Sequence, residues 1–220
     1  MKILAVGCSF TFGMELPDCP PDTFYVGKFA SKLAYPQLLA NDLNAELVNL
    51  SLPGGSNSRI FRTVMDNSTR EHYDLVICQW TDISRLDIRY NQRDFPVTAN
   101  SRWLDQEFPW IKDYFKNHYD DAHSYQTWIT QLIALQSHFK LMNQRYLFLN
   151  MVPMRYPVDK EFQHLIDQID TDYYIGWPQY ALVDWMGDCP KGPGGHPLEL
   201  GHQRIAEHVK EYIRNLGWLS

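Results

Sequence analysis

The chain has 220 residues, with 20 lysine or arginine side chains against 26 aspartate or glutamate side chains and a net charge of −6. This deficit of cations argues against nucleic-acid binding, because phosphate contacts require clustered lysine and arginine. An apolar share of 45% excludes a disordered chain, and no signal peptide or transmembrane segment is recognisable, so we expect a cytoplasmic protein that does not act at a membrane.

Short apolar runs alternate along the chain with segments of helical spacing. The first run, residues 2–6, ends at Gly7 and is typical of a buried parallel strand. Further strands are expected at residues 46–50, 74–80, 145–152 and 180–183. Helices are expected at residues 35–43, 57–70, 124–143, 160–169 and 198–216. This alternation predicts an α/β protein, a three-layer α/β/α sandwich around a parallel sheet of about five strands.

The alternation stops between residues 85 and 122, where aromatic side chains stand among many charges. A loop of that length without structure is improbable in a compact domain, so we expect short helices that form a cap or lid. Its aromatic residues, Trp103 and Trp110 among them, either cover the core or stack on sugar rings. We therefore expect a single domain over residues 1–220 with this segment inserted.

Small and polar residues follow the expected strands. Ser9 comes shortly after the first strand, Gly54 lies in the turn after the second, Thr81 follows the third, and His196 precedes the last helix. In open α/β sheets, ligands bind at the carboxyl ends of the strands. A serine, a late histidine and glycine-rich turns there are what acyl transfer requires, namely a nucleophile, a base and N–H groups that hold the oxyanion.

Three segments resemble the conserved blocks of the SGNH (GDSL-type) hydrolases and occur in that family's order. They are Gly7-Cys8-Ser9-Phe10-Thr11, Asn49-Leu50-Ser51-Leu52-Pro53-Gly54-Gly55-Ser56, and His196-Pro197 followed by Gly201-His202. The resemblance implies a flavodoxin-like SGNH fold with Ser9 as nucleophile and His196 as general base. It also implies that the N–H groups of Ser9 and Gly54 are oxyanion donors.

Two positions depart from the family pattern. The family has a further block, usually Gly-x-Asn-Asp, whose asparagine binds the oxyanion. Here Thr81 stands at the place of that asparagine, and Asn57 is a possible substitute. Pro193 stands where an aspartate usually precedes the histidine by three residues. Asp188 is the candidate acid, with Asp184 as a second; otherwise a backbone carbonyl orients His196 in a serine–histidine dyad.

These observations predict a serine esterase that cleaves a small acyl ester, such as an acetyl group on a glycan, through an acyl-enzyme on Ser9. Its candidate substrate-binding residues are Arg85, Trp80, Trp103 and Trp110. This reaction requires no metal or organic cofactor, so none is expected. A zinc site in particular is not expected, because no cysteine or histidine spacing matches a usual ligand pattern. The alternative is a weakened or inactive protein of the same fold that binds a glycan or another small molecule.

Overall fold

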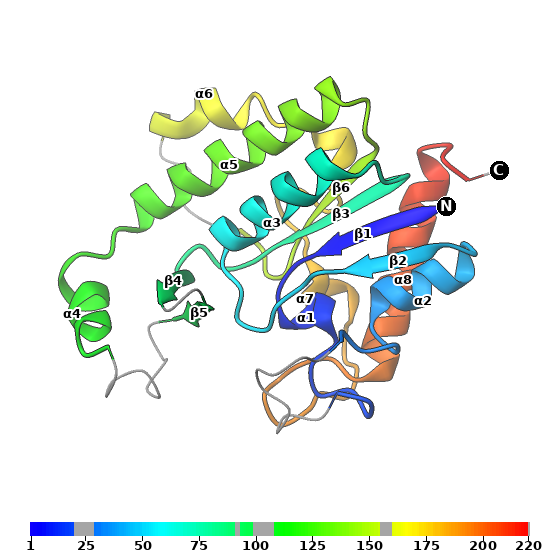
Figure 1. The fold of residues 1–220 in the computed structure, drawn as a ribbon, viewed down its shortest axis with the longest axis horizontal. Helices are drawn as coiled ribbons and strands as arrows, with labels where there is room; N and C mark the ends of the chain where they lie inside the picture. The colour runs from blue at the N-terminus through cyan, green and yellow to red at the C-terminus, as the bar shows by residue number, and fades with distance from the viewer. Residues whose placement is uncertain (20–28, 91–92, 99–107, 155–159, 220) are drawn as a thin grey trace.

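A computed structural model describes residues 1–19, 29–90, 93–98, 108–154 and 160–219. At its centre is a parallel sheet of four strands in the order β2-β1-β3-β6 (Figure 1). The strands are β1 (Lys2–Val6), β2 (Glu46–Asn49), β3 (Leu75–Trp80) and β6 (Tyr146–Asn150). Leu4 of β1 lies opposite Val48 on one side and Val76 on the other. The first three strands and the sixth therefore agree with the sequence prediction.

Helices cover both faces of this sheet, which confirms the expected sandwich. One layer contains α3 (Asn57–Arg70), α5 (Asp121–Leu141) and α6 (Gln163–Ile166); the other contains α2 (Tyr35–Asp42), α7 (Leu182–Trp185) and α8 (Glu199–Asn215). Because successive strand residues point to opposite faces, Leu4 belongs to the first core and Ile3 to the second. None of the helices in the described ranges is both long and apolar enough to cross a membrane.

The prediction of a fifth strand at residues 180–183 is wrong. Leu182 begins the short helix α7, and the Asp184 carboxylate accepts the Ala181 N–H at 2.8 Å, which fixes the first turn of that helix. Four apolar residues are too few to distinguish a strand from a buried helical turn by periodicity. At the outer edge of β6, the described chain instead forms one isolated parallel bridge, in which Phe148 of β6 pairs with Tyr174.

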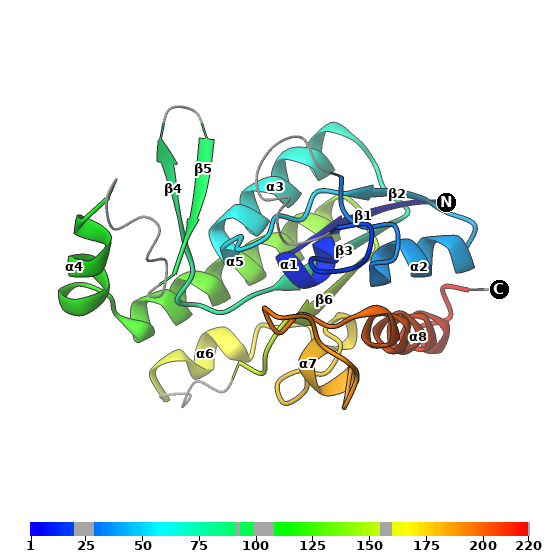
Figure 2. The ribbon, with the colours of Figure 1, turned by 90° about the horizontal axis from the view of Figure 1, so that it is seen from below.

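The segment expected to form short helices contains both a hairpin and a helix. Strands β4 (Leu86–Tyr90) and β5 (Arg93–Val97) pair antiparallel, and α4 (Trp110–Asn117) follows. The helical expectation is thus correct for α4 and wrong for the hairpin. Figure 2 shows hairpin and helix standing beside the main sheet, where they share a small apolar cluster built around Val97, Phe108 and Ile111.

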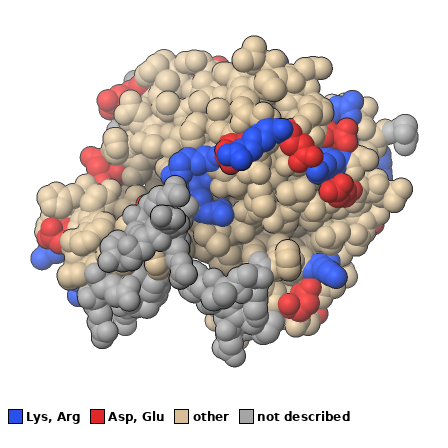
Figure 3. Space-filling view, in the orientation of Figure 1, with Lys and Arg blue, Asp and Glu red and all other residues tan. Residues whose placement is uncertain are grey.

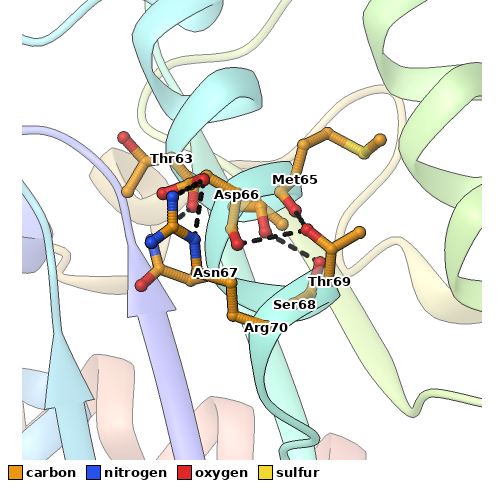
Figure 4. A network of polar contacts seen from close by, with 8 residues as sticks. Thr63, Met65, Asp66, Asn67, Ser68, Thr69 and Arg70 are labelled. Carbon is orange, nitrogen blue, oxygen red and sulfur yellow. Dashed lines mark hydrogen bonds and ion pairs between the residues drawn. The ribbon is translucent and has the colours of Figure 1, made fainter.

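The outer face of α3 carries polar side chains whose contacts are local. Arg70 pairs with Asp66 one turn earlier at 2.7 Å, and Asn67 donates to the Thr63 carbonyl oxygen at 2.7 Å (Figure 4). Figure 3 shows acidic and basic side chains next to one another on this side of the molecule. Exposed pairs of this kind contribute about 0–1 kcal/mol each, so this face is stabilised mainly by what α3 buries beneath it.

Candidate active site

The turn after β1 presents Ser9 as the first residue of the short helix α1 (Ser9–Phe12). The turn lies where the strand order reverses, since β1 pairs with β2 on one side and β3 on the other. Gln79 of β3 holds it: its Oε1 accepts the Cys8 N–H at 3.1 Å and the Thr11 hydroxyl at 2.9 Å. Gln79 was not among the residues predicted from the sequence, although a polar residue inside an apolar buried strand was a visible signal.

The Ser9 hydroxyl has no strong hydrogen-bond partner among the described residues. Its one contact there is the Cys8 thiol sulfur at 4.0 Å, and the residue is 4% exposed. Sulfur is a weak acceptor, so the Ser9 Oγ proton is not committed to a neighbouring group.

The His196 ring is fixed by a carboxylate and lies against α1. Its Nδ1 is 2.8 Å from Oε2 of Glu15, and its ring centroid is 5.6 Å from that of Phe10, the residue after Ser9. An ionised carboxylate accepts a hydrogen from Nδ1, which leaves Nε2 as the nitrogen that can take up a proton. Within the described contacts, the Ser9 hydroxyl and the imidazole are not hydrogen-bonded to each other.

Glu15 is seated in the loop that precedes α8. Its carboxylate also accepts the Gly194 N–H at 2.6 Å and the His196 N–H at 3.3 Å, and its side chain is 4% exposed. A Cβ at Gly192 would lie 2.5 Å from Glu15 Oε2, so a side chain at that position would displace the carboxylate. Glu15 itself has a φ of 70°, a left-handed conformation that non-glycine residues adopt rarely.

The net effect of this environment is to lower the pKa of Glu15. Burial acts in the opposite direction and raises it, but the hydrogen bonds from His196 and from two backbone N–H groups, together with the electrostatic attraction of His196, outweigh burial. The carboxylate is therefore ionised at neutral pH and can hold the imidazole in one tautomer.

The two aspartates considered from the sequence lie elsewhere. The Asp188 carboxylate accepts from Arg204 at 2.9 Å with a side chain that is 95% exposed, and Asp184 caps α7. The carboxylate that contacts His196 is thus that of Glu15, and not that of Asp188, which the sequence analysis expected there. Glu15 was missed because it belongs to a segment read as a loop; the crowding of glycines at 192–195 was the one available signal.

The candidate oxyanion residues lie after β2 and β3. Gly54 has a φ of 73°, in the turn after β2. Thr81 is fully buried, and its hydroxyl is 3.8 Å from the Met151 sulfur. The Asn57 amide bonds the Thr81 main chain in both directions: its Oδ1 accepts the Thr81 N–H at 2.8 Å and its Nδ2 donates to the Thr81 carbonyl at 3.0 Å. Asn57 therefore fixes the position of Thr81.

The four expected substrate-binding residues have different positions. Trp80 is fully buried in the core, 5.7 Å from the Phe148 ring centroid, so its assignment to the substrate is corrected to packing. Trp110 begins α4 and is 51% exposed, and Trp103 lies outside the described residues. Arg85 lies at the carboxyl edge of the sheet, with Nη2 3.7 Å from the Met151 sulfur.

Comparison with solved structures gives the same fold at low sequence identity. A family two carbohydrate esterase from Clostridium thermocellum, in complex with cellohexaose, is similar with a TM-score of 0.56 and 16% identity over 99% of this chain and 65% of that one. TesA has a TM-score of 0.57 and 13% identity, covering 98% of this chain and 99% of its own. The acetyl xylan esterase Est2A from Butyrivibrio proteoclasticus has a TM-score of 0.55 and 12% identity, over 100% of this chain and 64% of that one.

The fold is therefore the one that SGNH or GDSL-type esterases share. The chain spans about 65% of the length of the carbohydrate esterase. By sequence, the chain belongs to the family of unknown function DUF6071, whose family model matches residues 14–220. That range includes Glu15 and His196 and begins after Ser9. A search of curated proteins found no match.

Proposed function

We propose that this protein is a serine esterase in which Ser9 is the nucleophile, His196 the general base and Glu15 the residue that positions the base. The observation that carries the proposal is the 2.8 Å contact between Glu15 Oε2 and His196 Nδ1, on a ring that lies against the helix beginning with Ser9. A buried, ionised carboxylate on one imidazole nitrogen makes the other nitrogen a proton acceptor, which is the role that a nucleophilic serine requires.

The reaction proceeds in two transfers. The Ser9 oxygen attacks the ester carbonyl while His196 Nε2 takes the serine proton, and the alcohol leaves with that proton. Water then attacks the acyl carbonyl while Nε2 takes one of its protons, and the bond to the Ser9 oxygen breaks as Nε2 returns that proton to it, which releases the acid and restores the serine and the imidazole. Such a hydrogen bond between serine and imidazole commonly shortens only in the substrate complex.

The oxyanion is held by the N–H groups of Ser9 and Gly54, with the Thr81 hydroxyl as third donor. Thr81 is suited to this role because Asn57 fixes its main chain and its own hydroxyl faces only a thioether among the described contacts. Turning from that sulfur to an oxyanion would exchange a weak acceptor for a charged one.

We further propose that the inserted segment, residues 85–122, borders the site as a lid. A Cβ added to Gly54 would lie 3.0 Å from Pro96 Cβ, so strand β5 packs directly against the turn that contains Gly54. A small acyl group on a glycan is the substrate class favoured by the similarity to two carbohydrate-directed esterases.

A fluorophosphonate probe tests the proposal, because it labels only serines activated as nucleophiles. We expect stoichiometric labelling of the wild type, measured by intact mass, and loss of labelling in Ser9→Ala and in His196→Ala. Ser124→Ala, on α5, is the matched control and should label fully. A folded wild-type protein that takes no label would contradict the esterase and favour a binding protein with the same fold.

A further inference from the structure

Arg85 places a cation at the carboxyl edge of the sheet, where the Met151 side chain separates it from the turn that carries Ser9, called the nucleophile turn below. Its Nη2 lies 3.7 Å from the Met151 sulfur, and that sulfur lies 3.3 Å from the Cys8 thiol, which precedes Ser9. The Met151 sulfur also faces the Thr81 hydroxyl at 3.8 Å. The guanidinium, the oxyanion candidate and the nucleophile turn thus surround one methionine side chain.

Among the described residues, the guanidinium of Arg85 has no strong hydrogen-bond acceptor. Its Nη1 is buried and has no hydrogen-bond partner in the part of the chain that the structure describes, and its Nη2 has only the thioether. A thioether is a weak, uncharged acceptor. Buried N–H groups of charged side chains are normally paired, because leaving one unpaired costs its full desolvation penalty.

The nearest carboxylates in sequence are engaged elsewhere. Asp82 Oδ1 accepts the Ser84 N–H at 2.8 Å and the Ser84 hydroxyl at 2.5 Å. Asp87 pairs with Arg62 at 2.5 Å and also accepts the Ser56 hydroxyl. Each acid is therefore held in place by other donors, and Arg85 keeps its charge and its fork of N–H groups for a group from outside the chain.

We propose that Arg85 binds a carboxylate on the substrate, so that the esters this protein cleaves best are anionic. A guanidinium presents parallel N–H donors that match a planar carboxylate, and a partly desolvated pair is stronger than one in water. The preference for anionic esters rests on the proposed function, because it assumes that the protein cleaves esters. The anion site itself is a binding site and can be tested without turnover.

The test compares 4-acetoxybenzoate with 4-acetoxybenzamide, which differ in charge at the same distance from the ester. We expect Arg85→Gln to lower kcat/KM for the benzoate by about 10- to 100-fold relative to its effect on the benzamide, since a hydrogen bond to a charged group is lost. Arg70→Gln, on the outer face of α3, is the matched control and should leave the ratio unchanged. The sulfate ester analogue 4-acetoxyphenyl sulfate tests whether the site prefers a planar anion over a tetrahedral one.

Binding to the inert Ser9→Ala protein separates the two proposals. If the benzoate binds Ser9→Ala more tightly than the benzamide and Arg85→Gln in that background removes the difference, the anion site stands even if no variant hydrolyses esters. If the wild type hydrolyses both esters and Arg85→Gln slows them equally, the anion site is refuted and the esterase is retained. Equal binding of the two esters to Ser9→Ala also refutes the site.

Stability provides a second measurement that does not depend on activity. Arg85→Met should raise the melting temperature without ligand, because it replaces an unpaired, partly buried charge with an apolar side chain of similar length. A guanidinium that serves only to hold the fold together would instead lower the melting temperature when removed, and that result would overturn the inference.

Discussion

Replacing Glu15 with glutamine should lower kcat by about 10⁴-fold, with little change in KM, as expected when a triad loses its acid. Glutamine has the same shape and can still accept the Gly194 N–H, but it carries no charge to hold the hydrogen on His196 Nδ1. Steady-state kinetics on an activated acetate ester would measure the effect. The rate of fluorophosphonate labelling should fall in parallel, because both reactions require the same proton transfer.

The control is Asp188→Asn, which alters an exposed carboxylate bound to Arg204 and should keep wild-type kinetics within about twofold. Glu15→Asp should recover part of the lost rate, since it restores the charge but not the full reach. A KM that rises while kcat stays constant would show that Glu15 supports only the shape of the loop. Equal losses of kcat in Glu15→Asp and Glu15→Gln would also indicate that the charge of Glu15 does not matter and that its role is structural.

The fold was predictable because it depends on local periodicity. Apolar runs at residues 2–6 and 74–80 could be read as buried strands, and the long segments around α3, α5 and α8 had helical spacing. The prediction failed where a run was short, as at residues 180–183, or where an alternation of two was overlooked, as in the hairpin. In both cases the deciding interactions were hydrogen bonds that composition does not reveal.

The site was predictable only in part, because its residues are joined by contacts between distant parts of the chain. Local patterns were enough to place Ser9, Gly54 and Thr81 after the ends of strands and His196 before the last helix. The contact of Glu15 with His196 spans 181 residues, and no local pattern encodes it. In the SGNH hydrolases that the sequence resembles, an aspartate precedes the histidine by three residues. In this chain the carboxylate in contact with His196 comes from Glu15, six residues after Ser9.

His202 should make the protein lose stability between pH 6.5 and pH 4. The residue is fully buried on α8, where its Nδ1 accepts the Tyr35 N–H at 3.1 Å and its ring stacks on the Tyr35 ring, 6.3 Å away. Burial, and to a smaller extent the charge of His196, lowers the pKa of His202 from 6.5 to about 4. The imidazole is therefore neutral in the folded protein across this range.

In the unfolded chain the same imidazole takes up a proton as the pH falls through 6.5, while in the folded protein it does so only near 4. The unfolded state thus binds more protons between these values, and the free energy of unfolding falls with falling pH by about 3 kcal/mol over that interval, at about 1.4 kcal/mol per pH unit. The lowered pKa of Glu15 acts in the same direction at more acidic pH, below its ordinary value of 4.5.

Urea unfolding at several pH values would measure this dependence. His202→Asn keeps an acceptor for the Tyr35 N–H but cannot titrate, so its unfolding free energy should be lower than that of the wild type at pH 7 and should fall much less between pH 6.5 and 4. His72→Asn, at an exposed position, should keep the wild-type slope. If His202→Asn and the wild type lost stability with equal slopes, His202 would not be the group that takes up the proton on unfolding. His202 lies where α2 packs on α8. That result would mean that another group makes this helical layer sensitive to acid, such as the partly buried His208, whose pKa is also lowered by burial.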